Sequence, residues 1–168
     1  MHIIDPKLTA RTLRNYLFQA AIAAGYIFLV FMVLDHIVEL VIVAGLGSSA
    51  FIVFAMPSKV SAGPRFVVGG HIVCFIVGTL TRLSIHDLFA NFVALSPKIE
   101  MIVSCSLAVG LSLFMMVITD TEHPPAAGTA VGTAFADFSF AVMVSVLLGA
   151  LMLSVGKFLL RRWLKDLV

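Results

Sequence analysis

Residues 120–129 of the chain read Asp-Thr-Glu-His-Pro-Pro-Ala-Ala-Gly-Thr, a short polar stretch that two prolines interrupt. It lies between two long apolar runs, residues 99–118 and 135–155. Runs of that length and composition can cross a hydrocarbon core about 30 Å thick. The stretch between them is therefore either a tight exposed turn or a non-helical insert at membrane depth. Most of what the sequence predicts about function depends on which of the two it is.

The composition of the chain indicates an integral membrane protein. Of its 168 residues, 61% are hydrophobic and 12% are charged, and its mean hydropathy is +1.11. A soluble domain carries about 25% charged residues, so these apolar runs cannot all be hidden in one small soluble core. The formal net charge of +2 is too small to indicate a nucleic-acid partner. Cys74 and Cys105 lie inside apolar runs, which indicates buried thiols and excludes a secreted disulfide scaffold.

The apolar runs predict an all-α membrane protein with four transmembrane helices, over about residues 16–34, 66–80, 99–118 and 135–155. Two further segments, residues 40–56 and 121–134, carry glycines, serines or prolines that weaken a helix. We expect both to be broken or re-entrant half-helices. Each half of the chain then has a span, a broken segment and another span, so the chain forms two pseudo-repeats.

These elements make up one transmembrane domain over residues 16–157, after a cytoplasmic segment at 1–15 and before a basic cytoplasmic tail at 158–168. If residues 40–56 cross the membrane fully, the basic residues divide almost evenly between the two faces. If both broken segments enter and leave on the same side, only Lys59 and Arg65 lie on one face. The other face then holds Lys7, Arg11, Arg14, Arg82, Lys98, Lys157, Arg161, Arg162 and Lys165.

The second arrangement fits the positive-inside rule, by which cytoplasmic loops carry the excess of lysine and arginine. The sequence therefore predicts that both termini are cytoplasmic and that residues 120–129 lie on the opposite side. The two halves would then be parallel repeats about an axis along the membrane normal.

The broken segments predict a binding site for a small anion. Irregular backbone at membrane depth is tolerated only where it is buried in protein or lines a water-filled cavity. Helix N-termini in such places direct N–H donors and a positive dipole end toward an anion. Gly47, Ser48 and Ser49 precede one apolar run, Pro124 and Pro125 precede another, and both sets fit helix starts. Two facing half-helix N-termini would make the site.

Four more residues are candidates for this site. Thr129 offers a hydroxyl donor, and His123 offers a donor or titratable group at its mouth. His71 lies within an apolar run, where an ionisable residue is a functional hypothesis by default. Arg65 opens a span and would gather anions. Each candidate also has a structural interpretation, such as helix packing, a rigid turn, a carbonyl-bonded histidine or a snorkelling arginine.

Residues 119–130 resemble the signature of the HPP family, small integral membrane proteins that are named for a His-Pro-Pro triplet. Supporting pieces occur in the family's order, and the resemblance covers about residues 15–157. They are Gly47-Ser48-Ser49-Ala50, Pro57, Pro64-Arg65 and Gly69-Gly70-His71. The sequence departs from the family pattern at Ser48, at Phe66 and in the order of Ala127-Gly128.

The resemblance implies a four-span membrane protein, and members of the family in plastids and cyanobacteria are linked to nitrite transport. We therefore expect a transporter or channel for a small inorganic anion, nitrite above all, with no enzymatic activity, cofactor or metal. We place it in the bacterial inner membrane. Four spans with small-residue stripes such as Gly128 to Gly132 hardly enclose a pathway, so we also expect a homodimer.

Two alternatives stay open. Asp120, Glu122 and His123 are close enough in the sequence to form a metal-binding or acid–base cluster in a membrane-embedded enzyme. A fourth ligand and a nucleophile–base pair are missing nearby, however. The chain could instead be a structural or sensory membrane subunit that works with a separate protein.

Overall fold

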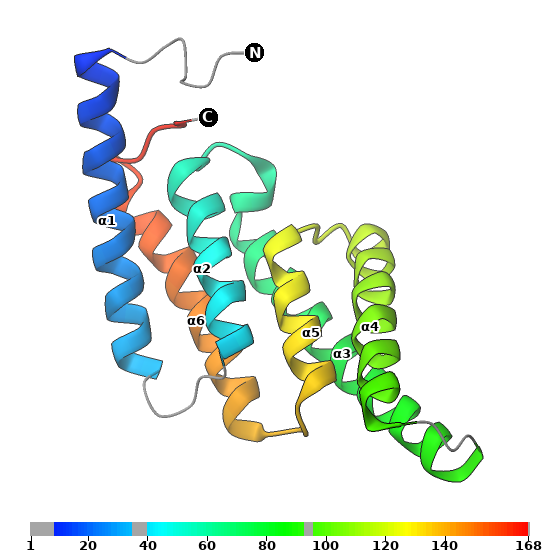
Figure 1. Cartoon of the computed structure of the whole chain (residues 1–168). Helices are drawn as coiled ribbons and strands as arrows, with labels where there is room; N and C mark the ends of the chain where they lie inside the picture. The colour runs from blue at the N-terminus through cyan, green and yellow to red at the C-terminus, as the bar shows by residue number, and fades with distance from the viewer. Residues whose placement is uncertain (1–8, 35–39, 93–95, 168) are drawn as a thin grey trace.

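The computed structural model describes residues 9–34, 40–92 and 96–167, and this part of the chain is all-helical (Figure 1). Two 3₁₀ turns, η1 (Val60–Ala62) and η2 (Pro124–Ala126), accompany the helices. The α-helices are α1 (Ala10–Leu34), α2 (Leu40–Ala55), α3 (Pro64–Phe92), α4 (Pro97–Thr119), α5 (Ala127–Phe135) and α6 (Phe140–Leu160).

Four of these helices are long and apolar enough to cross a membrane, as the sequence predicts. They are Thr12–Leu34, Pro64–Leu88, Pro97–Thr119 and Phe140–Leu160. The second of these spans differs from its predicted bounds, because α3 runs on past residue 80 to Phe92. Arg82 does not end it: its guanidinium Nη1 lies 2.9 Å from Glu100 Oε1 of α4, which pairs the charge inside the helix bundle.

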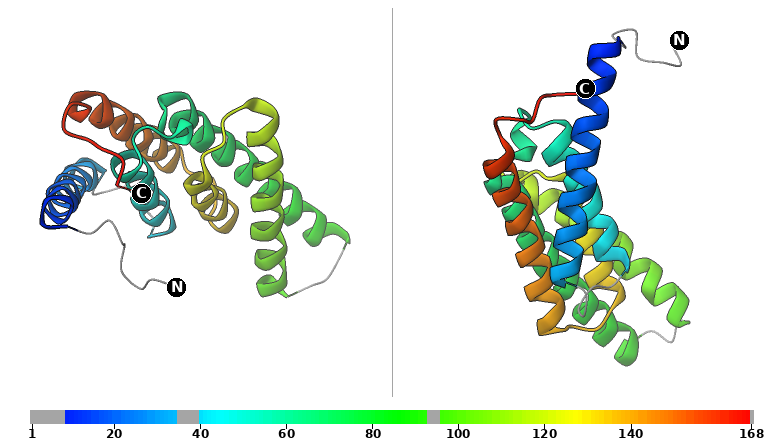
Figure 2. Two further views of the ribbon diagram at one scale, coloured as in Figure 1. Left: turned by 90° about the horizontal axis from the view of Figure 1, so that it is seen from above. Right: turned by 90° about the vertical axis from the view of Figure 1, so that its left-hand side faces the viewer.

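The short helices α2 and α5 lie side by side at the centre of the bundle (Figures 1 and 2). α1 and α6 pack against α2, while α3 and α4 pack against α5. Two buried apolar clusters correspond to these two groups of helices. One is built around Leu46, Phe54 and Val146, and the other around Cys74, Ala108 and Ala130.

The predicted break within residues 40–56 is wrong, because α2 is one continuous helix from Leu40 to Ala55. The hydroxyl of Ser48 donates to the Gly45 carbonyl at 2.9 Å within the same helix, and Ser49 Oγ lies 2.9 Å from the same carbonyl oxygen. Serines that bond back to their own helix need no break in it. The chain enters α2 at the end of the bundle where α1 finishes and leaves it where α3 begins (Figure 1), so it is not re-entrant within the bundle.

The second predicted break is present. After α4 ends at Thr119, Asp120 adopts a left-handed conformation with φ 53°, and the chain turns back into the bundle. Residues 121–123 are non-helical, and η2 and α5 follow. A Cβ atom added to Gly45 would lie 3.5 Å from the Thr129 nitrogen and 3.6 Å from the Pro125 oxygen. The half-helix that begins at these prolines therefore faces the middle of α2.

The half-helix also fails to return to the side from which it came. α5 ends where α6 begins, at the end of the bundle opposite Asp120 (Figure 1). Each half of the chain is thus a long helix, a short central helix and another long helix, and the two halves run in opposite senses. The pseudo-repeats are inverted, and the predicted parallel arrangement is wrong.

A polar seam closes the end of the bundle where α6 finishes. Gln19 of α1 is buried, and its amide nitrogen donates to the carbonyls of Phe54 and Lys165. Its amide oxygen accepts from the Lys165 N–H at 3.1 Å. The residues after α6 continue to the end of α2, where the Leu167 N–H donates to the Ala55 carbonyl at 2.9 Å. Helices α1, α2 and α6 are joined there.

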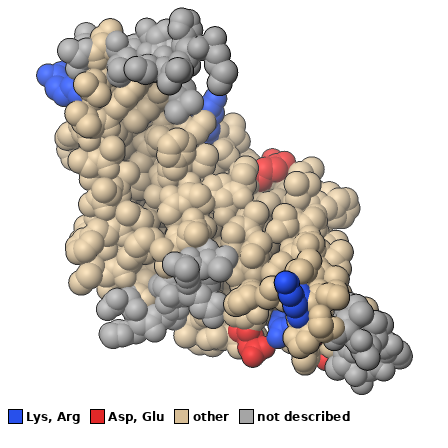
Figure 3. Space-filling model, viewed as in Figure 1, with Lys and Arg blue, Asp and Glu red and all other residues tan. Residues whose placement is uncertain are grey.

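Charged side chains lie near the two ends of the molecule, and a broad uncharged surface lies between them (Figure 3). Such a belt fits burial in a lipid bilayer. Of the described basic side chains, Arg82 and Lys98 belong to the end where α4 begins. The other end carries Arg14, Lys59, Arg65, Lys157, Arg161, Arg162 and Lys165.

Candidate functional site

A chain of hydrogen-bonding groups runs through the centre of the bundle. Ser49 Oγ lies 2.9 Å from Nε2 of His71 and 2.9 Å from Nε2 of His123. Nδ1 of His71 lies 2.7 Å from Thr129 Oγ1, and Nδ1 of His123 lies 2.8 Å from the Ser61 carbonyl oxygen. We call these four side chains and the Ser61 carbonyl the histidine network.

The histidine network is sealed from solvent. Ser49, His71, His123 and Thr129 are each 0% exposed, and the two imidazole rings lie 5.6 Å apart between centroids. Burying a polar group is costly unless it is hydrogen-bonded, so these groups stabilise one another in place. Ionisable side chains inside a membrane protein are candidates for a functional site, so the network is the candidate site of this protein.

Close backbone approaches position the network. A Cβ atom added to Gly70 would lie 2.8 Å from the His123 Cβ and 3.0 Å from the Thr121 carbonyl oxygen. Only glycine lets residues 121–123 lie directly on α3. Helices α2 and α5 also lie close together at Gly45, where an added Cβ would be in ordinary contact with the backbone of Pro125 and Thr129. The network therefore lies where the two inverted halves meet.

The structure brings together some of the predicted site residues. Ser49, His71, His123 and Thr129 form the histidine network, and Pro124 and Pro125 begin the half-helix beside it. The Ser61 carbonyl was not predicted, because a backbone acceptor leaves no signal in a sequence. Gly70 was visible as a glycine next to His71, but its role needs the fold.

The other predicted residues lie elsewhere. Gly47 lines a groove between α1 and α2, and the Ser48 side chain is exposed. Arg65 is on the end of the bundle, where its Nη2 lies 2.9 Å from Asp120 Oδ2 and donates to the Thr119 carbonyl at 3.2 Å. Ser48 and Ser49 lie inside α2, so the second of the two facing half-helix N-termini does not exist.

The structure does not join Asp120, Glu122 and His123 into one cluster. Asp120 pairs with Arg65 at the surface, whereas both ring nitrogens of His123 are bonded to Ser49 and Ser61 in the interior. Within the described ranges, no three His, Cys, Asp or Glu side chains are grouped so that they could hold a metal ion.

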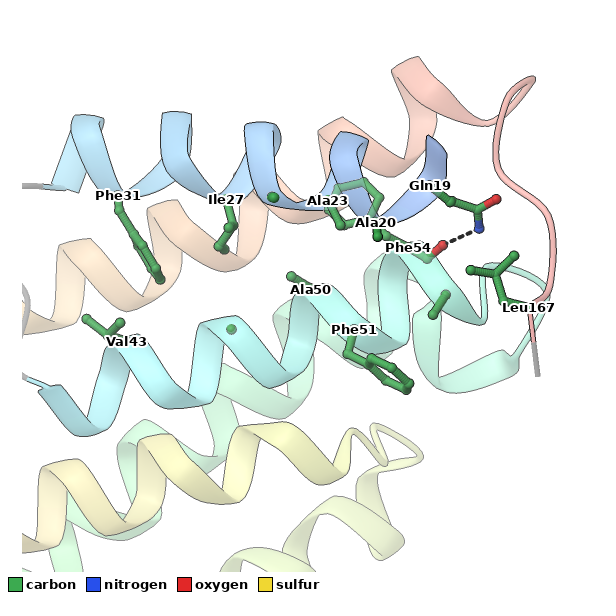
Figure 4. A pocket seen from close by; sticks show the side chains of 13 residues that line it. Gln19, Ala20, Ala23, Ile27, Phe31, Val43, Ala50, Phe51, Phe54 and Leu167 are labelled. Carbon is green, nitrogen blue, oxygen red and sulfur yellow. Dashed lines mark hydrogen bonds between the residues drawn. The ribbon is translucent and has the colours of Figure 1, made fainter. Parts of the chain in front are cut away.

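Two grooves lie near the network. One of about 470 Å³ separates α1 from α2 (Figure 4), and Gln19 is the polar residue among its otherwise apolar lining. That lining does not suit an anion. The other, of about 300 Å³, lies between α4 and residues 122–127, and Glu122 and His123 line it together with Pro124 and Ala127. This second groove adjoins the histidine network.

Comparison with known proteins, like the fold, indicates a membrane protein. A family model described as the HPP transmembrane region matches residues 8–166. The chain is similar to two transmembrane proteins of Dictyostelium discoideum, at 34% identity over 90 residues and 36% over 83 residues. These alignments cover 54% and 49% of this chain but 28% and 24% of the relatives. The chain thus spans about a quarter of the curated relatives that it matches.

No solved structure matches the chain. The names of the two relatives state a membrane location and no activity. The family model covers nearly the whole chain, including the His-Pro-Pro triplet at residues 123–125 and the elements that build the histidine network. This chain belongs to the HPP transmembrane family.

Proposed function

We propose that this protein is a membrane transporter or channel for a small inorganic anion, with nitrite as the first substrate to test. The histidine network is the observation that supports this function. It places two imidazoles and two hydroxyls at the centre of a membrane bundle, beside the N-terminus of the half-helix α5. Nitrite comes from the family resemblance, since family members in plastids and cyanobacteria are linked to its transport.

The chemistry of the network suits an anion once one imidazole is protonated. A neutral network has no net charge, and an isolated anion in the bundle would be poorly stabilised. An imidazolium supplies a positive charge, which a neighbouring anion stabilises in return. The hydroxyls of Ser49 and Thr129 and the positive end of the α5 dipole add to the attraction. Pro124 and Pro125 of η2 carry no N–H, and the N–H groups of Ala126 and Ala127 already donate within this turn, so the segment contributes the dipole of α5 rather than a cradle of donors.

The inverted repeats support the same proposal. In many transporters, two inverted halves meet near the bilayer midplane, and discontinuous helices at that interface hold the substrate. Here α5 is the discontinuous helix, and Ser49 of α2 faces it across the interface between the halves. A site at that place can be reached from either side when the halves rock against each other.

A flux assay tests the proposal. Purified protein in liposomes should carry nitrite, and the rate should rise toward acid pH because imidazolium forms as pH falls. His123→Ala should remove the flux. His86→Ala is the matched control, because His86 is exposed and bonded to Glu100 outside the network. Correctly folded wild-type protein without nitrite flux at any pH would overturn the proposal.

Homodimerisation and a location in the bacterial inner membrane stay predictions of the same proposal. Chemical cross-linking in native membranes measures the first. A monomer that transports nitrite at full rate would contradict it.

A further inference from the structure

The Ser61 carbonyl sets the direction of every hydrogen bond in the histidine network. A carbonyl oxygen only accepts, so Nδ1 of His123 carries a hydrogen. In neutral His123, Nε2 is then an acceptor, and the hydroxyl of Ser49 donates to it. That uses the single hydrogen of Ser49, so Nε2 of His71 must donate to Ser49 Oγ. Nδ1 of His71 consequently accepts from the hydroxyl of Thr129.

The hydrogen bonds of the neutral network therefore all run in one direction. Thr129 donates to His71, His71 to Ser49, Ser49 to His123, and His123 to the Ser61 carbonyl. The two histidines are held in opposite tautomers. His71 carries its hydrogen on Nε2, and His123 carries its hydrogen on Nδ1. This assignment follows from the positions of the five groups and from the number of hydrogens that each can donate.

One extra proton fits into this order without the loss of a contact. Ser49 Oγ also lies 2.9 Å from the Gly45 carbonyl oxygen. If Nε2 of His123 gains a proton, it donates to Ser49 Oγ, and the hydroxyl hydrogen turns to Gly45. Ser49 still accepts from His71. Within the described contacts, the Thr129 hydroxyl has no such second acceptor, so the extra proton belongs on His123.

We propose that the histidine network is a proton-binding site that takes one proton on Nε2 of His123, with Ser49 as its switching hydroxyl, and that this proton crosses together with the anion. A hydronium ion gives the proton and leaves as water, one N–H bond forms, and the Ser49 O–H bond rotates without breaking. A monovalent anion then balances the imidazolium. The coupling to the anion rests on the proposed function, whereas the proton site does not.

Few ionisable groups face His123. His71 lies across Ser49 on α3, and Glu122 lines the same groove as His123. The α4 side of that groove is apolar, with Val109, Leu113, Met116 and Val117. The pair of Arg65 and Asp120 is neutral overall and lies at the exposed end of the bundle. The charge on a protonated His123 is therefore left for Glu122 or for the anion to balance.

Nitrogen-15 NMR tests the tautomers directly. The chain has five histidines, and replacing His2, His36 and His86 by glutamine leaves only the two of the network. At neutral pH, we expect one Nδ1–H and one Nε2–H tautomer. On acidification, one imidazolium should form while the other ring stays neutral. Two identical tautomers, or two rings that protonate together, would overturn the assignment.

Variants of Ser49 test the switch. Ser49→Ala should release the two rings from opposite tautomers and remove the pH dependence of nitrite flux. Ser49→Thr keeps a hydroxyl, so this variant should show the opposite tautomers and the pH-dependent flux of the wild type. The matched control is Ser145→Ala, because Ser145 is equally buried and, among the residues that the structure describes, bonds to the Ala141 carbonyl of its own helix alone. An Ser49→Ala protein that behaves like wild type in both measurements would contradict the proposal.

Charge movement separates the two proposals. Nitrite flux in liposomes under a clamped membrane potential should carry no net charge, since one proton moves with each anion. Flux that carries one negative charge per nitrite would overturn the coupling and leave the anion transporter standing. Proton binding on His123 without any nitrite flux would overturn the transporter and leave the proton site standing.

Discussion

At Gly70, the missing side chain decides where His123 can lie. Gly70→Ala would place a Cβ 2.8 Å from the His123 Cβ and 3.0 Å from the Thr121 carbonyl oxygen. One atom is backbone and the other is the first side-chain carbon of a buried histidine, so neither can move aside easily, and we expect a loss of stability of about 1–3 kcal/mol. Thermal unfolding in detergent measures it. Gly110→Ala is the control, because nothing lies within 4 Å of the added Cβ, and this variant should be at least as stable as wild type.

At Thr129, one hydroxyl completes the network. Thr129→Val keeps the shape of the side chain but leaves Nδ1 of His71 without its partner, and an unsatisfied buried acceptor costs about 1–3 kcal/mol. Chemical or thermal unfolding should show that loss. Thr133→Val removes a hydroxyl that bonds only to carbonyls of its own helix, so it should cost less. Equal losses in the two variants would contradict the role of Thr129.

At the scale of residues, the sequence predicted the network in part. His71 was a candidate because it lies in an apolar run, and Ser49, Thr129 and His123 were candidates as hydrogen-bond donors to an anion at half-helix N-termini. Ser48 was an equal candidate with Ser49, although only Ser49 faces the histidines. Successive residues of a helix point about 100° apart. Because α2 is apolar on all sides, its sequence has no periodicity from which the inward-facing serine could be predicted.

At the scale of elements, Asp166 fastens the tail that follows α6. The hydroxyl and the backbone N–H of Ser58 hydrogen-bond to its carboxylate and hold the pKa of Asp166 below its ordinary value of 3.8, with smaller contributions from Lys59 and Lys157. Because the pKa of Asp166 is lowered in the folded protein, the contact stabilises the fold at pH values above the ordinary pKa of this carboxyl group. The contact is lost as pH falls through the lower, folded-state pKa.

We therefore expect the Leu167 amide, which donates to Ala55, to stay protected from hydrogen exchange at pH 5 and to lose protection under stronger acid. Asp166→Asn should lose part of that protection already at pH 5, since its side chain carries no charge, and should change less than wild type under stronger acid. Exchange measured by mass spectrometry on the tail peptide tests this. Protection that does not depend on residue 166 would contradict it.

The elements themselves were largely predictable. Four long apolar runs became four long helices, and the two prolines began a half-helix. The break expected in residues 40–56 is absent, and two kinds of contact explain why. Gly45 packs against the backbone of α5, and the hydroxyls of Ser48 and Ser49 lie 2.9 Å from a carbonyl of their own helix. A sequence shows that glycine and serine weaken a helix, but it does not show which neighbour stabilises it.

At the scale of the whole molecule, the two halves are related by inversion. The helix contacts follow this relation, both within and between the halves: α1 with α2 corresponds to α4 with α5, and α1 with α6 corresponds to α4 with α3. From the sequence, we weighed two topologies. In one, residues 40–56 cross the membrane, and in the other neither short segment crosses it. The structure carries both short segments from one end of the bundle to the other (Figure 1).

In this arrangement the basic residues are still divided unevenly between the two ends of the bundle, but the residues at the less basic end are different ones. Lys59 and Arg65 now lie at the end that also holds Lys157 and the basic tail, and Arg82 and Lys98 lie at the opposite end. The positive-inside rule then places the end that contains residues 58–65 and 120–123 in the cytoplasm. The sequence-based topology placed those residues on the other side.

Cysteine labelling distinguishes the two topologies. In a background without Cys74 and Cys105, Ser58→Cys should be protected from an impermeant thiol reagent in intact cells, and Ser96→Cys should be labelled. Both positions are exposed, and permeabilised cells give the control in which both react. Labelling of Ser58→Cys in intact cells would return residues 58–65 to the side that the sequence first indicated.

The seam at Gln19 has a consequence for biogenesis. Its partner Lys165 lies 146 residues later in the chain, whereas its other partner, the Phe54 carbonyl, belongs to the next helix. During translation, α1 can therefore pack against α2 early, but two of the three hydrogen bonds of the Gln19 amide cannot form until the residues after α6 have been synthesised. The seam is completed last, after every helix of the bundle has been made.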